Sequence, residues 1–295
     1  MKNKNFKSYL YLSLAMIMVG SSFVVGKLIS STMPIFLSSF LSLLIASVLF
    51  IPTVTPAIKS KKLTKKDYFY LGLQGLLGTV LYRIFLFISL RYVDAGYAGI
   101  LSALQPAMIA LLAIFFLGEK QTRKEKIGIG LAVVGLIIVY LSNKISVVLG
   151  SQLIFGTILV VLAVFGEACF SVFAKKLNKN IQPMVIAGMV TVMSCIMSLP
   201  LALYDIYKYG FNISFFGALL ISYYGVFLTY ISFIFWFKGL KQVSASIAGV
   251  FTALIPVSGV IFSIIMLKDL PSFYEVVGGL LIVLSIFLVV YKNEK

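Results

Sequence analysis

Long apolar runs separated by short polar segments follow one another along the whole chain. A helix needs about 20 apolar residues to cross the roughly 30 Å hydrocarbon layer of a bilayer. By this measure the pattern predicts ten transmembrane helices. They fall near residues 8–28, 34–55, 68–90, 94–117, 125–142, 152–177, 183–204, 214–237, 244–267 and 274–291. The first run follows lysines as in a signal peptide, but no small-residue cleavage site stands out, so we expect a retained helix.

Composition supports a fold whose solvent is lipid. The chain is 61% hydrophobic and only 12% charged, and its mean hydropathy is +1.07. Soluble domains are about half apolar and about a quarter charged. We therefore predict an all-α integral membrane protein surrounded by the lipid bilayer. There is no histidine, and Cys169 and Cys195 both lie in apolar runs, so we expect two buried thiols, no metal site and no cofactor.

The net charge of +16 comes from basic residues clustered between the apolar runs, not along one helix face, so we expect no nucleic-acid partner. If the N-terminus is cytoplasmic, nineteen lysines and arginines fall in cytoplasmic segments and five in outer segments. The five are Lys27, Arg91, Lys144, Lys208 and Lys268. Short cytoplasmic loops carry such an excess of basic residues. The bias predicts a multi-pass protein of the cell membrane with both termini in the cytoplasm.

The second half of the chain repeats the first with a shift of 150 residues. LRYVDAGYAGILSALQP at 90–106 aligns without a gap with LKQVSASIAGVFTALIP at 240–256. We therefore expect two domains, 1–144 and 150–292, each with five helices. Because five is an odd number, the second half enters the membrane from the opposite side. Such inverted repeats are typical of transporters, whose halves exchange inward-open and outward-open shapes around a central site.

Several of these segments resemble a known family. They are Gly20-Ser21-Ser22-Phe23, with Val19 in the place of a tryptophan, and Ala98-Gly99, Leu104-Gln105-Pro106, Phe116-Leu117-Gly118-Glu119, Gly128 and Gly135. Together they resemble the drug/metabolite transporter superfamily, specifically its EamA-type ten-helix members. The resemblance implies export, or less often uptake, of amino acids, metabolites or drugs. The expected partners are a small-molecule substrate and the bilayer, and a monomer is favoured.

Two ionisable residues, Arg83 and Glu167, lie well inside predicted spans. Each costs about 2.5–3.5 kcal/mol at a helix centre, so each should face a cavity or a partner. Glu167 lies about 15 Å from the cytoplasmic end of its helix at 1.5 Å per residue. That depth is close to the midplane, where inverted-repeat transporters bind substrate. Two interpretations stay open: a structural ion pair, or binding of substrate or protons by at least one of the two.

The segment EACFSVFAK, from Glu167 to Lys175, also resembles the first helix of the small multidrug resistance proteins. The membrane glutamate of those relatives binds either protons or the cationic drug. Here the matching position in the first half is Val19, so only one half carries the glutamate. A carboxyl group in a medium of low dielectric can bind and release a proton near neutral pH. A single proton or cation site therefore stays possible.

Other candidates lie near the same depth. Pro106 and Pro256 are expected in mid-helix at repeat-matched positions, where they either kink the helices at the cavity or give fixed bends for packing. Gln105 has a polar amide with little reason to face lipid. Tyr82, Tyr230 and Trp236 either form an aromatic wall or serve in packing.

We therefore predict a transporter of small organic solutes, amino acids or related metabolites, working by alternating access with export favoured. The alternatives are a proton-coupled exporter of drugs or other cations, a membrane-embedded enzyme and a sensor. An enzyme needs a dense cluster of polar catalytic groups, for which only Arg83 and Glu167 qualify. A channel needs a ring of like charges or a carbonyl filter, and the sequence suggests neither.

Overall fold

The computed structural model describes residues 2–60, 63–118, 127, 130–131, 134–135, 138, 150–178, 180–242, 248, 251–252 and 254–290. Within these ranges all regular structure is helical. Seven helices there are long and apolar enough to cross a membrane, so this is a multi-pass membrane protein. They are Phe6–Thr32, Ile35–Lys59, Lys65–Ser89, Ala95–Leu117, Ser151–Ala174, Pro183–Tyr209 and Phe215–Lys241. Their positions agree with seven of the ten predicted spans.

The three other predicted spans are not among these seven helices. The fifth, at 125–142, falls mostly outside the described residues. The ninth corresponds to the shorter apolar helix α14, Leu254–Leu267, and the tenth to α15, Phe273–Val290. The ten-helix count and the inverted relation of the halves therefore stay predictions.

Four of the long spans change helical geometry along their length. The first predicted span consists of α1 (Lys2–Gly20) and α2 (Ser22–Thr32), and the third consists of α4 (Lys65–Gly75), η1 (Leu76–Leu81) and α5 (Tyr82–Ser89). The fourth consists of α6 (Ala95–Leu101), η2 (Ser102–Leu104) and α7 (Gln105–Leu117). The eighth consists of α11 (Phe215–Tyr223), η4 (Tyr224–Ile231) and α12 (Ser232–Gln242). Both η1 and η4 are π-helical, a geometry often found at functional sites. They end at 81 and 231, which are matched positions of the 150-residue repeat.

The sequence predicted that Pro106 lies in the middle of a helix, and the structure differs from this prediction. Pro106 lies in the first turn of α7, directly after the 3₁₀ turn η2. Proline fits the first helical turn because its missing N–H has no partner there in any case. The interruption of the span is therefore the 3₁₀ turn. Pro256 is the third residue of α14 as described and is buried.

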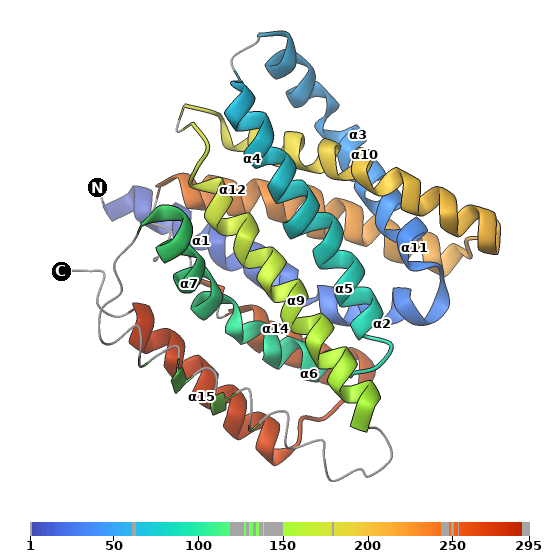
Figure 1. Ribbon diagram of the computed structural model, residues 1–295, viewed down its shortest axis with the longest axis vertical. Helices are drawn as coiled ribbons and strands as arrows, with labels where there is room; N and C mark the ends of the chain where they lie inside the picture. Colours follow the sequence, from blue (N-terminus) through green and yellow to red (C-terminus); the bar gives the residue numbers. More distant parts are fainter. Residues whose placement is uncertain are drawn as a thin grey trace.

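Helices from both halves of the chain pack against one another (Figure 1). The remaining long helices are α3 (Ile35–Lys59), α9 (Gly150–Ala174) and α10 (Pro183–Tyr209). α10 lies along α3, α1 contacts α12 and α14, α5 and α7 contact α9, and α6 contacts α14. The connections α2–α3, α5–α6 and α10–α11 lie at one end of the bundle, and α3–α4 and α9–α10 lie at the other. We call these the Lys27 end and the Lys175 end.

The Gly20-Ser21-Ser22-Phe23 motif brings the first span close to α14. A Cβ atom on Gly20 would lie 1.9 Å from Ser258 Oγ and 2.9 Å from the backbone nitrogen of Gly259, so no larger residue fits. Phe23 is buried against Gly259 and near Gly99 of α6. The motif therefore serves close packing of α1 and α2 on α6 and α14. The two thiols, Cys169 and Cys195, are free and buried, as expected.

Candidate functional site

A cavity of about 60 Å³ lies in the core of the bundle, between segments of both halves. We call it the central cavity. Its lining is Val19, Ser22, Gly78, Thr79, Tyr82, Arg83, Glu167, Phe170, Tyr224, Leu228 and Phe233. An adjacent cavity of about 40 Å³ is lined by Met16, Val19, Gln105, Glu167, Phe170, Ser171, Ser232, Phe233 and Trp236. Each has room for a few water molecules, since one water needs about 10–15 Å³ by this measure.

Glu167 borders both cavities. It lies on α9 directly after Gly166, where a Cβ atom would come within 2.4 Å of the Leu77 carbonyl oxygen of η1. The missing side chain lets α9 approach the π-helical segment, and this approach sets the position of the carboxyl group. The side-chain amide of Gln105, from α7, hydrogen-bonds to the Glu167 carboxyl group.

Arg83 is buried on the wall of the central cavity and is held by neutral groups. Its Nη1 donates to Ser42 Oγ at 2.7 Å and to the carbonyl oxygen of Ser39 at 3.4 Å, and its Nη2 donates to Thr229 Oγ1. The guanidinium carbon lies 4.7 Å from the centre of the Tyr224 ring, in a cation–π contact. These partners come from α3 and η4, so Arg83 joins three spans.

Arg83 and Glu167 line the same cavity without forming an ion pair. Among the described residues, the ion pair within 4.0 Å joins Lys27 and Asp94, and it involves neither Arg83 nor Glu167. The geometry therefore does not support the structural ion pair that the sequence left open. Both charged groups instead line the same cavity.

Two other buried carboxylates have clear structural roles. Asp205 accepts from the backbone nitrogens of Phe36, at 2.8 Å, and Leu37, at 3.0 Å, in the first turn of α3. Asp67 forms a capping box with Thr64 at the start of α4 and accepts from the Asn178 backbone nitrogen. Helix caps of this kind are common uses of a carboxylate. Glu167 lies in the interior of α9, so capping does not explain it.

Five polar atoms on the two cavities are buried and have no hydrogen-bond partner in the described structure. They are Ser22 Oγ, Thr79 Oγ1 and Tyr82 OH on the central cavity, and Gln105 Oε1 and Trp236 Nε1 on the adjacent cavity. Buried polar atoms nearly always have a partner, which can be an ordered water. This concentration is what a site for water or a polar solute requires.

The structure brings five candidates from the sequence together around these cavities: Glu167, Arg83, Gln105, Tyr82 and Trp236. Three others lie elsewhere. Pro106 and Pro256 are buried but belong to neither lining, and Tyr230 packs against Phe50 with ring centres 4.6 Å apart.

Sequence reasoning missed several polar residues of the site: Ser22, Ser42, Thr79, Tyr224 and Thr229. Thr79 and Thr229 match in the 150-residue repeat, and that recurrence of a polar residue in two apolar spans was a usable signal. Nothing in the sequence marks Ser42 among the many serines of its span.

Residues matched between the two halves line the central cavity in pairs. Gly78 and Leu228, and Arg83 and Phe233, are 150 residues apart. Val19 and Glu167, and Ser22 and Phe170, are 148 residues apart. The cavity therefore lies where equivalent parts of the halves meet. In three of these pairs one residue is polar and its counterpart is apolar: Arg83 with Phe233, Glu167 with Val19, and Ser22 with Phe170. The two halves therefore contribute different polar groups to the cavity.

A cluster of three phenylalanines lies between these cavities and the Lys175 end. The ring centres of Phe170 and Phe233 are 5.3 Å apart, those of Phe170 and Phe237 are 5.4 Å apart, and those of Phe233 and Phe237 are 6.4 Å apart. Phe237 also lines a larger cavity of about 480 Å³ that includes Lys175 and Lys241. The aromatic cluster therefore separates this larger cavity from the small ones.

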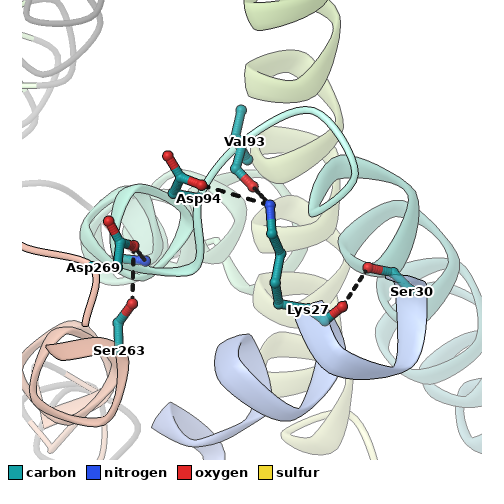
Figure 2. Close-up of polar contacts among 7 residues, drawn as sticks. Lys27, Ser30, Val93, Asp94, Ser263 and Asp269 are labelled. Carbon is teal, nitrogen blue, oxygen red and sulfur yellow. Dashed lines mark hydrogen bonds and ion pairs between the residues drawn. The ribbon is translucent and has the colours of Figure 1, made fainter. Parts of the chain in front are cut away.

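Polar contacts join the helices at the Lys27 end (Figure 2). Lys27 Nζ donates to the carbonyl oxygen of Val93 at 2.9 Å and lies 3.6 Å from the Asp94 carboxylate. Asp269 accepts from the backbone nitrogen of Gly96 at 3.1 Å and from the Ser263 hydroxyl at 2.9 Å. We call these contacts the polar clamp. It ties α2 and the end of α14 to the start of α6.

Comparison with known proteins identifies similar chains. Residues 6–141 and 154–291 each match the EamA-like transporter family. An uncharacterized transporter of Bacillus subtilis (strain 168), YetK, is 35% identical over 99% of this chain and 89% of its own. An uncharacterized transporter of Archaeoglobus fulgidus is 26% identical over 97% of this chain and its whole length. A crystal structure with 18% identity, covering 98% of this chain and 99% of its own, shares the fold with a TM-score of 0.65.

Proposed function

This chain belongs to the EamA-like transporter family, and from that premise we propose that it transports small organic solutes by alternating access between two inverted repeats. We propose amino acids or related metabolites as the solutes and export as the direction. The observation that carries the proposal is a cavity at matched positions of the halves, bordered by Glu167, Arg83 and unpartnered polar atoms. Inverted-repeat transporters bind substrate at such an interface.

Two sets of contacts are candidates for barriers between the central cavity and the two ends of the bundle. The polar clamp ties the helices at the Lys27 end, and the aromatic cluster of Phe170, Phe233 and Phe237 separates the cavity from the space at the Lys175 end. Alternating access requires that these barriers open one at a time around the same site. We propose the clamp as the outer gate and the aromatic cluster as the inner gate.

The excess of lysine and arginine predicts that the Lys175 end faces the cytoplasm. Asn212→Cys at the Lys27 end and Ser60→Cys after α3 test this prediction, because both positions are exposed. In a background without Cys169 and Cys195, a membrane-impermeant thiol reagent should label Asn212→Cys in intact cells and leave Ser60→Cys unlabelled. The opposite labelling pattern would reverse the topology, and with it the assignment of the two gates.

A second candidate function is proton-coupled export of organic cations. Glu167 favours it, because this carboxyl group borders both cavities and forms no ion pair within the described part of the chain. Arg83 opposes it, because a buried guanidinium on the same cavity repels a cation. Amino acids and related metabolites therefore fit the site better than purely cationic drugs.

A counterflow screen in proteoliposomes tests the proposed function. Vesicles loaded with single unlabelled amino acids or related metabolites should accumulate the same labelled compound transiently when they contain the protein. Protein-free vesicles and vesicles with heat-denatured protein serve as controls. We expect at least one compound to exchange about 10-fold faster than in the controls, since a closed bilayer excludes charged solutes. If no metabolite, amine or drug exchanges above the controls, the transport proposal is wrong.

A further inference from the structure

The charge of the central cavity points to the chemical class of the solute, an inference that rests on the proposed transport function. Arg83 is 2% exposed, and its described partners are two hydroxyls, one carbonyl oxygen and one aromatic ring. None of these groups carries a negative charge. A buried cation in a membrane protein is expected to have an anionic counterpart or to face a site that receives one.

The two hydroxyls that accept from Arg83 have already used their protons. Ser42 Oγ donates to the carbonyl oxygen of Ser39 at 2.8 Å, and Thr229 Oγ1 donates to that of Tyr224 at 3.0 Å. The hydroxyl oxygens are thereby fixed as acceptors and hold the guanidinium on the cavity wall. This arrangement positions the cation of Arg83 and does not neutralise it.

Hydrogen-bond donors surround the cation on the cavity side. The hydroxyls of Ser22, Thr79 and Tyr82 line the same cavity and are buried without a hydrogen bond of normal geometry, and Ser22 lies close to the hydroxyls of Tyr82 and Tyr224. Each can donate one hydrogen bond to an anionic oxygen. Thr79 lies one turn before Arg83 along the third span, and Ser22 comes from α2. A cation together with several hydroxyl donors matches a carboxylate, whose two oxygens only accept.

We propose that Arg83, at the wall of the central cavity, is the residue that binds the carboxylate of the transported solute. Glu167 and the Oε1 of Gln105 line the adjacent cavity, which Arg83 does not line, and can only accept from a bound group while Glu167 is ionised. An ammonium group suits that side. The charges of the site therefore match a small zwitterion with its carboxylate toward α5 and its amine toward α9, and the cavity has to widen to admit it.

Matched probes separate this inference from the transport proposal. The probes are L-amino acids, the corresponding α-carboxamides, inorganic phosphate and tetraphenylphosphonium. Each L-amino acid and its amide share the amine and the side chain, and only the acid has a carboxylate. Exchange by the wild-type protein in proteoliposomes should discriminate for an acid against its amide by about 100-fold, the scale expected when one partner of a buried charge pair is missing. This comparison needs no variant to fold.

Two variants then assign the carboxylate to Arg83. Arg83→Gln should lose the preference for acids over amides, whereas Arg83→Lys should retain part of it because the positive charge remains. Arg91→Gln is the matched control, since this arginine binds the Ser30 carbonyl oxygen at the Lys27 end and lines neither small cavity. It should keep the full preference. Correct folding is checked by monodisperse elution and by thermal unfolding of each purified variant.

The outcomes are distinguishable. Equal exchange of acids and amides, or an unchanged preference in well-folded Arg83→Gln, would refute the carboxylate site while leaving transport intact. Exchange of tetraphenylphosphonium alone, or of phosphate alone, would also refute it and would support a cation or phosphate transporter. If no probe exchanges, the transport proposal is wrong, and the carboxylate site, which depends on it, is refuted as well.

Discussion

Glu167→Gln is expected to lower solute accumulation driven by a pH gradient by about 100-fold, the scale of losing a positioned proton-transfer group. Glutamine has nearly the same shape and volume as glutamate but does not titrate. Glu167 borders both cavities and forms no ion pair within 4.0 Å among the described residues, which is the position that a proton-carrying group requires. Flux of the same solute should be measured with and without a pH gradient in proteoliposomes.

The two measurements separate the roles of the carboxyl group. If Glu167 only carries protons, the variant should lose gradient-driven accumulation and keep exchange without a gradient. If Glu167 binds the amine of the solute, both activities should fall together. Asp205→Asn is the control, because Asp205 is a buried carboxylate that caps α3. It should keep the cap, because the asparagine amide oxygen can still accept from the backbone nitrogens, and it should keep its coupling to the pH gradient.

A double variant tests whether the two charged residues act in transport at all. If Glu167 and Arg83 served only to balance each other, Glu167→Gln with Arg83→Gln would restore both expression and flux. We expect the double variant to remain inactive, because both side chains face the cavity and neither contacts the other. Full gradient-driven transport by the double variant would contradict the functional role of both residues.

Opening either gate is expected to expose the central cavity from one side only. Ser22→Cys is a suitable reporter, because its hydroxyl lies on the cavity without a partner in the described structure. In a background without Cys169 and Cys195, Lys27→Met removes the clamp contacts to Val93 and Asp94. It should raise labelling of the reporter by a polar thiol reagent from the Lys27 end by about 10-fold, since a charge-assisted hydrogen bond contributes about 1.5–3 kcal/mol. Phe237→Ala should raise labelling from the Lys175 end instead.

The matched control for the clamp is Lys208→Met. Lys208 lies at the Lys27 end, with its Nζ 5.7 Å from the Tyr204 ring centre and 5.2 Å from that of Tyr209, and is not part of the clamp. It should leave labelling of the reporter unchanged. Inside-out and right-side-out vesicles give the two directions of access. Labelling that rises from the same side in both Lys27→Met and Phe237→Ala would disprove their assignment to opposite gates.

The sequence by itself determined the class of the molecule and the position of its key residues within the long spans. A bilayer accepts only spans that are apolar and satisfy their own backbone hydrogen bonds, so the span positions were readable from hydropathy. The same physics makes a charge inside a span conspicuous, which is why the pattern alone singles out Arg83 and Glu167. Gln105 stands out for a related reason, as a polar amide in an apolar run.

Only the tertiary structure decided how these residues are related. Arg83 is held by Ser42, 41 residues before it, and by Thr229, 146 residues after it, and no local pattern links them. The sequence predicted similar depths for both charges, so it left open both an ion pair and separate roles in binding. The close approach of α9 to η1 at Gly166 and the positions of the neutral partners settled the geometry. Distances of a few ångströms between distant segments depend on how whole helices pack, whereas hydropathy reports only which solvent each segment prefers.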